Sequence, residues 1–151
     1  MKKTTFFGVT GFAVLTLIFL SAFKAAPGPG DHPNYLHALT NLRSARWLLE
    51  HRPGNWKQTM DEITAVKEID MAIMEIKKGD IDDKHDNSWK PEVKEVTDRP
   101  GRLKEAVDFL HMAQADVKME DPKFANGLKG KTLQHVDAAT ASAEKAVHAQ
   151  K

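Results

Sequence analysis

The sequence predicts an all-α protein, an antiparallel up-down four-helix bundle preceded by an N-terminal signal or anchor helix. Apolar residues recur at intervals of three and four in four separate segments of the chain. Aromatic residues make up only 7% of the chain, so the core must come from Leu, Ile, Val, Met and Ala, a composition that favours helices. Two short connections and one long connection join the segments, which favours antiparallel packing around a shared core.

Residues 1–26 have the pattern of an export signal. Lys2 and Lys3 precede an uncharged apolar run over residues 6–23, and small residues follow it. This run is close to the lower length limit for crossing a bilayer, so an uncleaved anchor in the inner membrane is the alternative to cleavage. Residues 27–30 (PGPG) form a flexible spacer. We therefore expect a periplasmic or secreted bundle domain over residues 31–151.

The first predicted helix begins around Pro33, which suits the first helical turn, and Asp31 or His32 is available to cap it. It continues to about His51, where Arg-Pro-Gly-Asn ends it. Its apolar side chains form one face, which we expect to be buried: Tyr35, Ala38, Leu39, Leu42, Ala45 and Leu49.

The second predicted helix begins near Thr59 and ends before Gly79. Thr59 and Glu62 have the spacing of a capping box. The β-branched residues of its stripe recur at intervals of three and four, whereas a half-buried strand would alternate every two residues, so a helix is predicted. The stripe consists of Ile63, Val66, Ile69, Ile73 and Ile76.

A long connection without helical periodicity covers residues 80–98, and we expect Trp89 to hold it against the bundle. The third predicted helix runs from Asp98 to about Glu120. The fourth follows Asp121-Pro122 and continues to the C-terminus, with a broken first turn because Gly127 and Gly130 disfavour helix. Inward-facing residues of these two helices are Leu103, Ala106, Val107, Leu110, Ala113, Val117, Val136, Ala139, Ala143 and Ala146.

Charge and cysteine content limit the classes of function. The formal net charge is +1, from 22 basic and 21 acidic residues, which supports neither a nucleic-acid partner nor a basic membrane tether. Membrane contact is expected only through an uncleaved N-terminal segment. The absence of cysteine excludes disulfides, zinc–thiolate and iron–sulfur sites, thiol catalysis and covalent c-type haem.

Polar side chains on the predicted inner faces are the candidate ligand-binding residues. Arg46 and Asp70 are expected to pair, since a buried lone charge is costly. The pair is interpreted first as a structural ion pair between the first two helices. The alternative is that Arg46, Asp70, Gln114 and His135 line a polar cavity that receives a ligand.

A metal site or non-covalent haem site would have to use His111 and His135 across the core. No two of the seven histidines share a helix face at a spacing of three or four, so hydrogen-bonded boundary histidines are the simpler interpretation. The acidic segment from Asp80 lacks the residue pattern of an EF-hand calcium loop.

The sequence has no Gly-rich phosphate loop, no Gly-x-Ser-x-Gly and no Ser-x-x-Lys in a plausible setting, and no catalytic residue or cofactor is predicted. The leading hypothesis is a non-catalytic binding or structural module with an unknown protein or small-molecule partner outside the cytoplasm. A small periplasmic carrier that binds a metal ion or haem through histidines is the alternative. An acid–base enzyme centred on Asp70 and His135 is the least favoured.

Three segments carry a resemblance to known proteins: residues 32–46 (HPNYLHALTNLRSAR), 68–77 (EIDMAIMEIK) and 81–84 (IDDK). With these segments the chain resembles a group of small exported bacterial helical-bundle proteins of unknown function. The likeness continues through Arg102-Leu103, Asp116, Glu120-Asp121 and residues 135–137. It implies an exported helical bundle and no particular chemistry.

Overall fold

The computed structural model describes residues 32–85, 89–93 and 96–150, which form an all-α bundle of four helices. They are α1 (Pro33–Glu50), α2 (Met60–Lys78), α3 (Arg99–Met119) and α4 (Leu128–His148). The predicted all-α four-helix bundle is confirmed. The predicted signal or anchor segment (1–26) and the spacer (27–30) lie outside the described residues.

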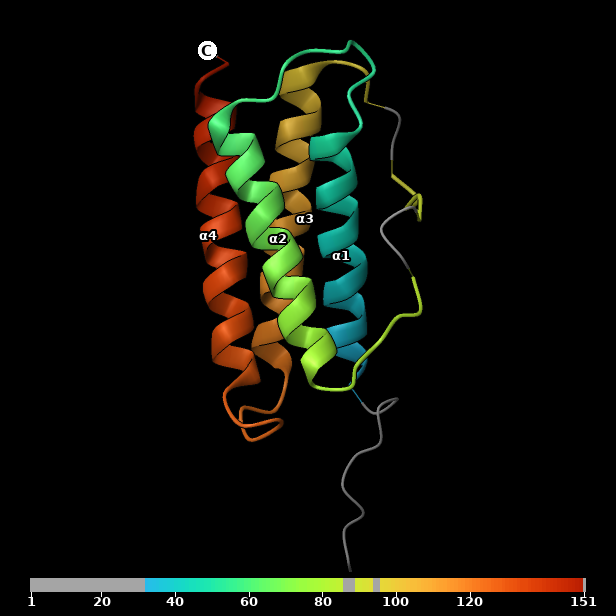
Figure 1. The fold of residues 1–151 in the computed structure, drawn as a ribbon, viewed down its shortest axis with the longest axis vertical. Helices are drawn as coiled ribbons and strands as arrows, with labels where there is room; N and C mark the ends of the chain where they lie inside the picture. Colours follow the sequence, from blue (N-terminus) through green and yellow to red (C-terminus); the bar gives the residue numbers. More distant parts are fainter. Residues whose placement is uncertain (1–31, 86–88, 94–95, 151) are drawn as a thin grey trace, which may run out of the picture.

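Each helix packs against two neighbours. α1 contacts α2 and α3, and α4 contacts the same two helices, so α1 faces α4 across one diagonal and α2 faces α3 across the other. Every pair in contact is antiparallel (Figure 1). The antiparallel packing predicted from the sequence is therefore present between all neighbouring helices.

The path of the chain explains how α2 and α3 come to share a diagonal. The described residues between α2 and α3 (79–85, 89–93 and 96–98), which we call the crossover connection, lie along α1 from the end of α2 to the start of α3 (Figure 1). Because of this return, α2 and α3 run in the same direction while α1 and α4 run in the opposite one. Long crossovers of this kind occur in other four-helix bundles.

Core residues agree closely with the predicted stripes of α1 and α4. All six predicted residues of α1 are buried, and the small side chains of α4 are fully buried against their neighbours. The stripe of α2 is rotated from its predicted position. Ile63 is 45% exposed and Val66 is only partly buried, whereas Ala65 and Ala72 are in the core. Alanines at the contact let α2 and α4 pack closely.

Side chains cap the starts of α1, α2 and α3. The predicted capping box of α2 is confirmed, since the Thr59 hydroxyl accepts from the Glu62 N–H and the Glu62 carboxylate accepts from the Thr59 N–H. At α1 the cap comes from another helix. The Glu120 carboxylate, at the end of α3, accepts from the Tyr35 N–H at 3.1 Å and from the His32 ring at 3.0 Å. A carboxylate at a helix N-terminus also interacts favourably with the helix dipole.

The start of α4 differs from the prediction. The helix begins at Leu128, later than the predicted start after Asp121-Pro122. Ala125, Asn126 and Gly127 have positive φ angles of 45°, 31° and 85°, so the chain turns before the helix begins. Only glycine adopts this left-handed conformation without steric cost, which explains Gly127 at the N-cap of α4. Gly130 lies inside the helix.

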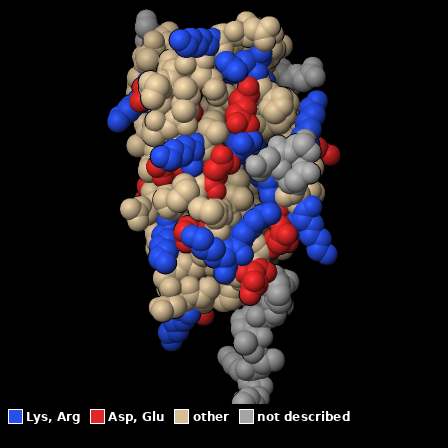
Figure 2. Space-filling view, viewed as in Figure 1, with Lys and Arg blue, Asp and Glu red and all other residues tan. Residues whose placement is uncertain are grey.

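Charged side chains of both signs are interspersed over the face seen in Figure 2. Within the described part of the chain, none of the helices combines the length and the apolar character needed to cross a bilayer.

Candidate functional site

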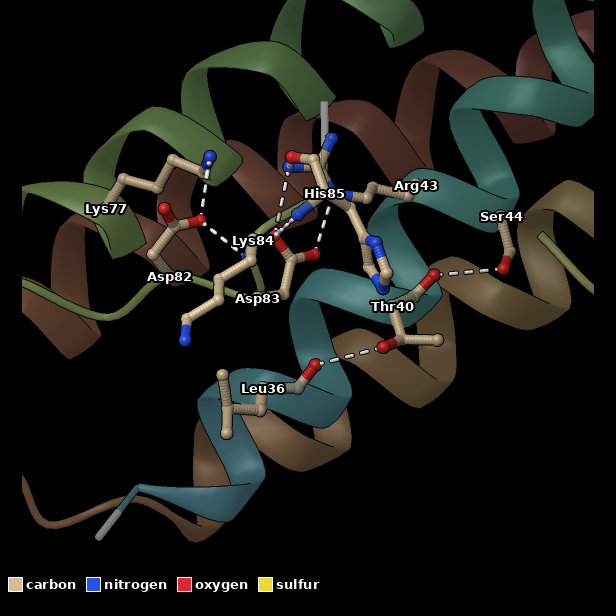
Figure 3. Close-up of polar contacts among 9 residues, drawn as sticks. All are labelled: Leu36, Thr40, Arg43, Ser44, Lys77, Asp82, Asp83, Lys84 and His85. Carbon is tan, nitrogen blue, oxygen red and sulfur yellow. Dashed lines mark hydrogen bonds and ion pairs between the residues drawn. The ribbon is translucent and has the colours of Figure 1, made fainter. Parts of the chain in front are cut away.

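A buried ion pair fastens the crossover connection to α1. The Arg43 guanidinium donates to both carboxylate oxygens of Asp83, at 2.7 and 3.1 Å, and to the backbone carbonyl of His85 at 2.5 Å (Figure 3). The two charged side chains are only 4% and 6% exposed. An Arg–carboxylate contact through two parallel bonds is among the stronger and more directional interactions in proteins.

Sequence periodicity does not identify Arg43, because this residue lies beside the predicted apolar stripe. Ser44 and Leu48 are also buried, although they too lie off that stripe. The crossover connection runs along this side of α1, so α1 is covered on a second side that helix periodicity assigns to solvent. Leu48 and Trp47, two adjacent apolar residues outside the stripe, were the available signal.

Apolar residues at both ends of the crossover connection also hold it. Ile81 is fully buried in the core, Pro91 is buried, and Val93 packs against the core. Trp89, predicted to anchor this connection, is only partly buried and stacks on His85 of the same connection, with ring centroids 4.2 Å apart. The connection is therefore held by the ion pair and by Ile81 in addition to any contribution from the indole.

Lys77 and Asp82 form a second, more exposed contact at the start of this connection, at 3.0 Å (Figure 3). The hydrogen bond from Lys77 lowers the pKa of the Asp82 carboxyl, and the Lys84 N–H adds to the effect.

The predicted pair of Arg46 and Asp70 is confirmed at 2.6 Å, and Arg46 also contacts Glu50. Its surroundings are more open than predicted. The Arg46 side chain is 15% exposed and that of Asp70 is 44% exposed, so the pair lies at the boundary between α1 and α2.

The other two candidate ligand residues have partners elsewhere. Gln114 donates to Asp137 at 2.5 Å on the exposed side of α3 and α4, and His135 contacts Glu68 at 2.7 Å between α4 and α2. Arg46 and Asp70 are thus brought together, whereas Gln114 and His135 each lie at a different helix interface.

The two candidate metal ligands also have separate partners. His111 lies 3.5 Å from Glu144 at the interface of α3 with α4, and His135 pairs with Glu68 at the interface of α4 with α2. Among residues 32–85, 89–93 and 96–150, no group of three or more potential ligands is placed to hold a metal ion.

The C-terminal end of α1 is capped entirely by donors from its surroundings. The Trp47 carbonyl accepts from the His51 N–H, and the Leu48 carbonyl accepts from the Arg102 guanidinium. The Leu49 carbonyl accepts from the Gln58 amide, and the Glu50 carbonyl accepts from the Arg52 guanidinium. A helix end normally leaves these carbonyls without a partner inside the helix. Here two guanidiniums are brought to one end of the bundle as a result.

A cavity of about 490 Å³ lies beside this capped end, and we call it the Trp47 cavity. The volume falls in the range of small-molecule sites. Residues from α1, the following turn, the crossover connection and α3 line it: Trp47, His51, Arg52, Pro53, Val96, Thr97 and Arg102. The described lining therefore combines an apolar wall with two guanidiniums and carries no carboxylate.

Arg102 is the most unusual residue in this lining. It is only 3% exposed, and its guanidinium lies 5.0 Å from the Trp47 ring centroid. Nε donates to the Leu48 carbonyl and Nη1 to the Val96 carbonyl, but buried Nη2 has no hydrogen-bond partner in the described structure. Burial lowers the pKa of Arg102, while the Glu105 carboxylate opposes this shift. An unpaired buried donor of this kind is costly.

A second cavity, of about 560 Å³, lies on the α3 side of Val96 and has the opposite character. Three acidic residues, Glu92, Glu105 and Asp108, line it together with one lysine and apolar side chains. Val96 therefore separates a basic cavity from an acidic one.

Residues of the segments on which the expected resemblance rests contact one another in the fold. Arg43 pairs with Asp83, Arg46 with Asp70, and His32 with Glu120. Asp116 and His135 also bond across helix interfaces, to Asn41 and Glu68. In the described structure these residues join separate segments of the bundle. No protein-family model matches the chain, and no curated protein and no solved structure is significantly similar to it.

Proposed function

We propose that the chain is a non-catalytic binding module that acts outside the cytoplasm. Its binding face comprises the crossover connection, the side of α1 beneath it and the start of α3. The export pattern of Lys2, Lys3 and the apolar run over residues 6–23 supports the location.

The observation that carries the proposal is the buried Arg43–Asp83 pair. Long connections without helices or strands are uncommon in compact domains and are often functional. Binding residues commonly lie on loops that a rigid scaffold holds in place. Here a two-bond ion pair fixes such a connection, and the Trp47 cavity opens at the end of the same face.

The pairing of the resemblance residues supports a module that does not catalyse a reaction. Polar residues at a catalytic centre converge on a space where a substrate reacts. Arg46 and His135 instead engage partner side chains at separate helix interfaces. Their arrangement favours a role in holding the bundle that supports the binding face.

The test is a nuclear magnetic resonance screen of the ¹⁵N-labelled chain with a panel of neutral, anionic and cationic small molecules. We expect chemical-shift changes to gather on residues 43–53, 80–85, 89–93 and 96–105. Perturbations confined to the α2–α4 side, or none with any compound, would contradict the proposal.

A matched pair of variants sharpens this test. Asp83→Ala removes the partner that fastens the connection, so we expect affinity for any bound compound to fall by about tenfold or more. Asp137→Ala removes a carboxylate from the exposed α3–α4 side and should leave affinity unchanged. Circular dichroism at the assay temperature verifies that both variants remain helical.

A further inference from the structure

We propose that the Trp47 cavity binds a small organic anion, a carboxylate carried by an apolar or aromatic group. This inference rests on the proposed binding function and names the class of ligand for one part of that face. Two features carry it, the unpaired buried donor on Arg102 and the unequal distribution of charge around the cavity.

The first feature is a donor that needs an acceptor. The guanidinium of Arg102 has five N–H donors and no acceptor. The Leu48 and Val96 carbonyls hold Nε and Nη1, and this leaves Nη2 without a partner. A carboxylate oxygen matches the geometry of guanidinium better than a neutral acceptor does. Nη2 is buried in the present rotamer, so a carboxylate in the cavity would satisfy this donor once the Arg102 side chain turns Nη2 toward the cavity that it lines.

The second feature is the charge around the cavity. Arg52 and Arg102 line it, and the Lys90 ammonium lies 5.7 Å from the Trp47 ring centroid. The C-terminal end of α1 opposes an anion with about half a negative charge. Two guanidiniums outweigh this charge, and the end carbonyls of α1 are already bonded to donors. The Glu105 carboxylate, whose charge acts on Arg102, lines the neighbouring cavity.

The apolar wall indicates an organic ligand over an inorganic one. Trp47, Pro53 and Val96 contribute apolar surface to the lining. The His51 ring stacks on the Trp47 indole at 4.6 Å, with an interplanar angle of 14°, and His51 is exposed. An aromatic ligand can replace this exposed ring on the indole at little cost, since stacking is retained. The Thr97 hydroxyl offers one further donor at the same cavity.

Three probes with the same ring and different charge test the class of ligand: benzoate, benzyl alcohol and benzylamine, with inorganic phosphate as a fourth arm. The chain has three tryptophans, so its indole N–H resonances are few, and Trp47→Phe identifies that of Trp47. We expect benzoate to shift the Trp47 indole signal and the backbone signals of residues 51–53, 96–97 and 102. Its affinity should exceed that of benzyl alcohol by about tenfold or more and should fall as salt is added.

Two charge-removing variants distinguish binding by the cavity's own charge from general electrostatic attraction to the protein surface. Arg52→Gln should weaken benzoate binding by about fivefold or more, whereas Lys57→Gln, an exposed change in the same turn outside the lining, should alter it by less than about twofold. Arg102→Lys keeps the positive charge but not the planar set of donors, and we expect it to weaken the binding of benzoate more than the binding of benzyl alcohol. If Arg102→Lys does not fold, Arg52→Gln still decides the test.

Each remaining outcome counts against the inference. Equal affinity for benzoate and benzyl alcohol at these signals would overturn the anionic class and leave the binding face intact. Stronger binding of phosphate than of benzoate would overturn the organic class. Failure of all four probes at the cavity would overturn the inference, whereas the proposed function fails only if the wider panel also leaves the whole face unperturbed.

Discussion

Two Arg–Asp pairs on α1 differ strongly in how far they are buried. Arg43 and Arg46 are one turn apart, and each donates to an aspartate from outside the helix. The side chains of the Arg43–Asp83 pair are 4% and 6% exposed, whereas Asp70, the partner of Arg46, is 44% exposed. We attribute this difference to the crossover connection, which supplies both Asp83 and the His85 carbonyl that accepts from Arg43.

The difference shows that position on a helix does not by itself set the energy of an ion pair. Removal of one partner from a buried pair leaves a desolvated charge and is strongly destabilising. Exposed pairs contribute little, because water and salt screen both charges. The two pairs therefore give a matched comparison within one helix.

The largest effect is expected at Asp83. Asp83→Ala should lower the free energy of unfolding by about 3 kcal/mol, because the buried Arg43 guanidinium would lose both of its hydrogen bonds to the Asp83 carboxylate. Urea denaturation followed by circular dichroism measures the change. The neighbouring variant Asp82→Ala is the control, since the side chain of Asp82 is 56% exposed and its loss should be much smaller. Equal losses of stability in Asp83→Ala and Asp82→Ala would contradict the expected dependence on burial.

An intermediate effect concerns Tyr35, a buried group of α1 whose hydroxyl has no hydrogen-bond partner among the described residues. Burial, with a smaller contribution from Glu120, raises its pKa from 10.0 to about 12. Between these values the unfolded chain loses the phenolic proton and the folded chain retains it, so stability should fall as pH rises from 10 to about 12. The loss is absent below pH 10.

This shift is directly measurable because the chain has a single tyrosine. Tyrosinate absorbance of the folded protein should titrate well above the value for the denatured protein. Tyr35→Phe should remove the corresponding alkaline loss of stability and leave stability at pH 7 nearly unchanged, since the hydroxyl has no partner to lose. An ordinary tyrosine titration in the folded protein would contradict the account.

The smallest effect is expected at Asp70. Asp70→Asn should cost less than about 1 kcal/mol, since its carboxylate is partly hydrated and Arg46 retains its contact with Glu50. The same urea experiment measures it. A loss near that of Asp83→Ala would mean that the Arg46 pair is closed to water and that the crossover connection is not the cause of the difference.

Sequence spacing predicts local features of the helices, such as a buried face or a capped start. The buried face of α1 and the capping box of α2 follow from spacing alone, and both are confirmed. Ile63 was placed wrongly, because a helix with apolar residues on more than one side does not define which side meets its neighbours. The start of α4 was placed too early, since successive left-handed residues before Leu128 have no periodic signature.

Features that depend on the path of the crossover connection were beyond sequence reasoning. Arg43 is buried against Asp83, which lies 40 residues further along the chain. The Trp47 cavity likewise combines Trp47, Val96 and Arg102 from three separate segments. No local spacing relates these residues. The candidate set Arg46, Asp70, Gln114 and His135 was chosen from single-helix projections, and the same limitation explains why its members have partners at different interfaces.

The central claim is that the Arg43–Asp83 pair fastens the crossover connection to α1. A double-mutant cycle with Arg43→Met and Asp83→Leu tests it most directly, by urea denaturation of the four proteins. We predict a coupling energy of at least about 2 kcal/mol, with the double variant far more stable than the sum of the single losses implies. Additivity within about 0.5 kcal/mol would show that the two residues act independently and would contradict the account.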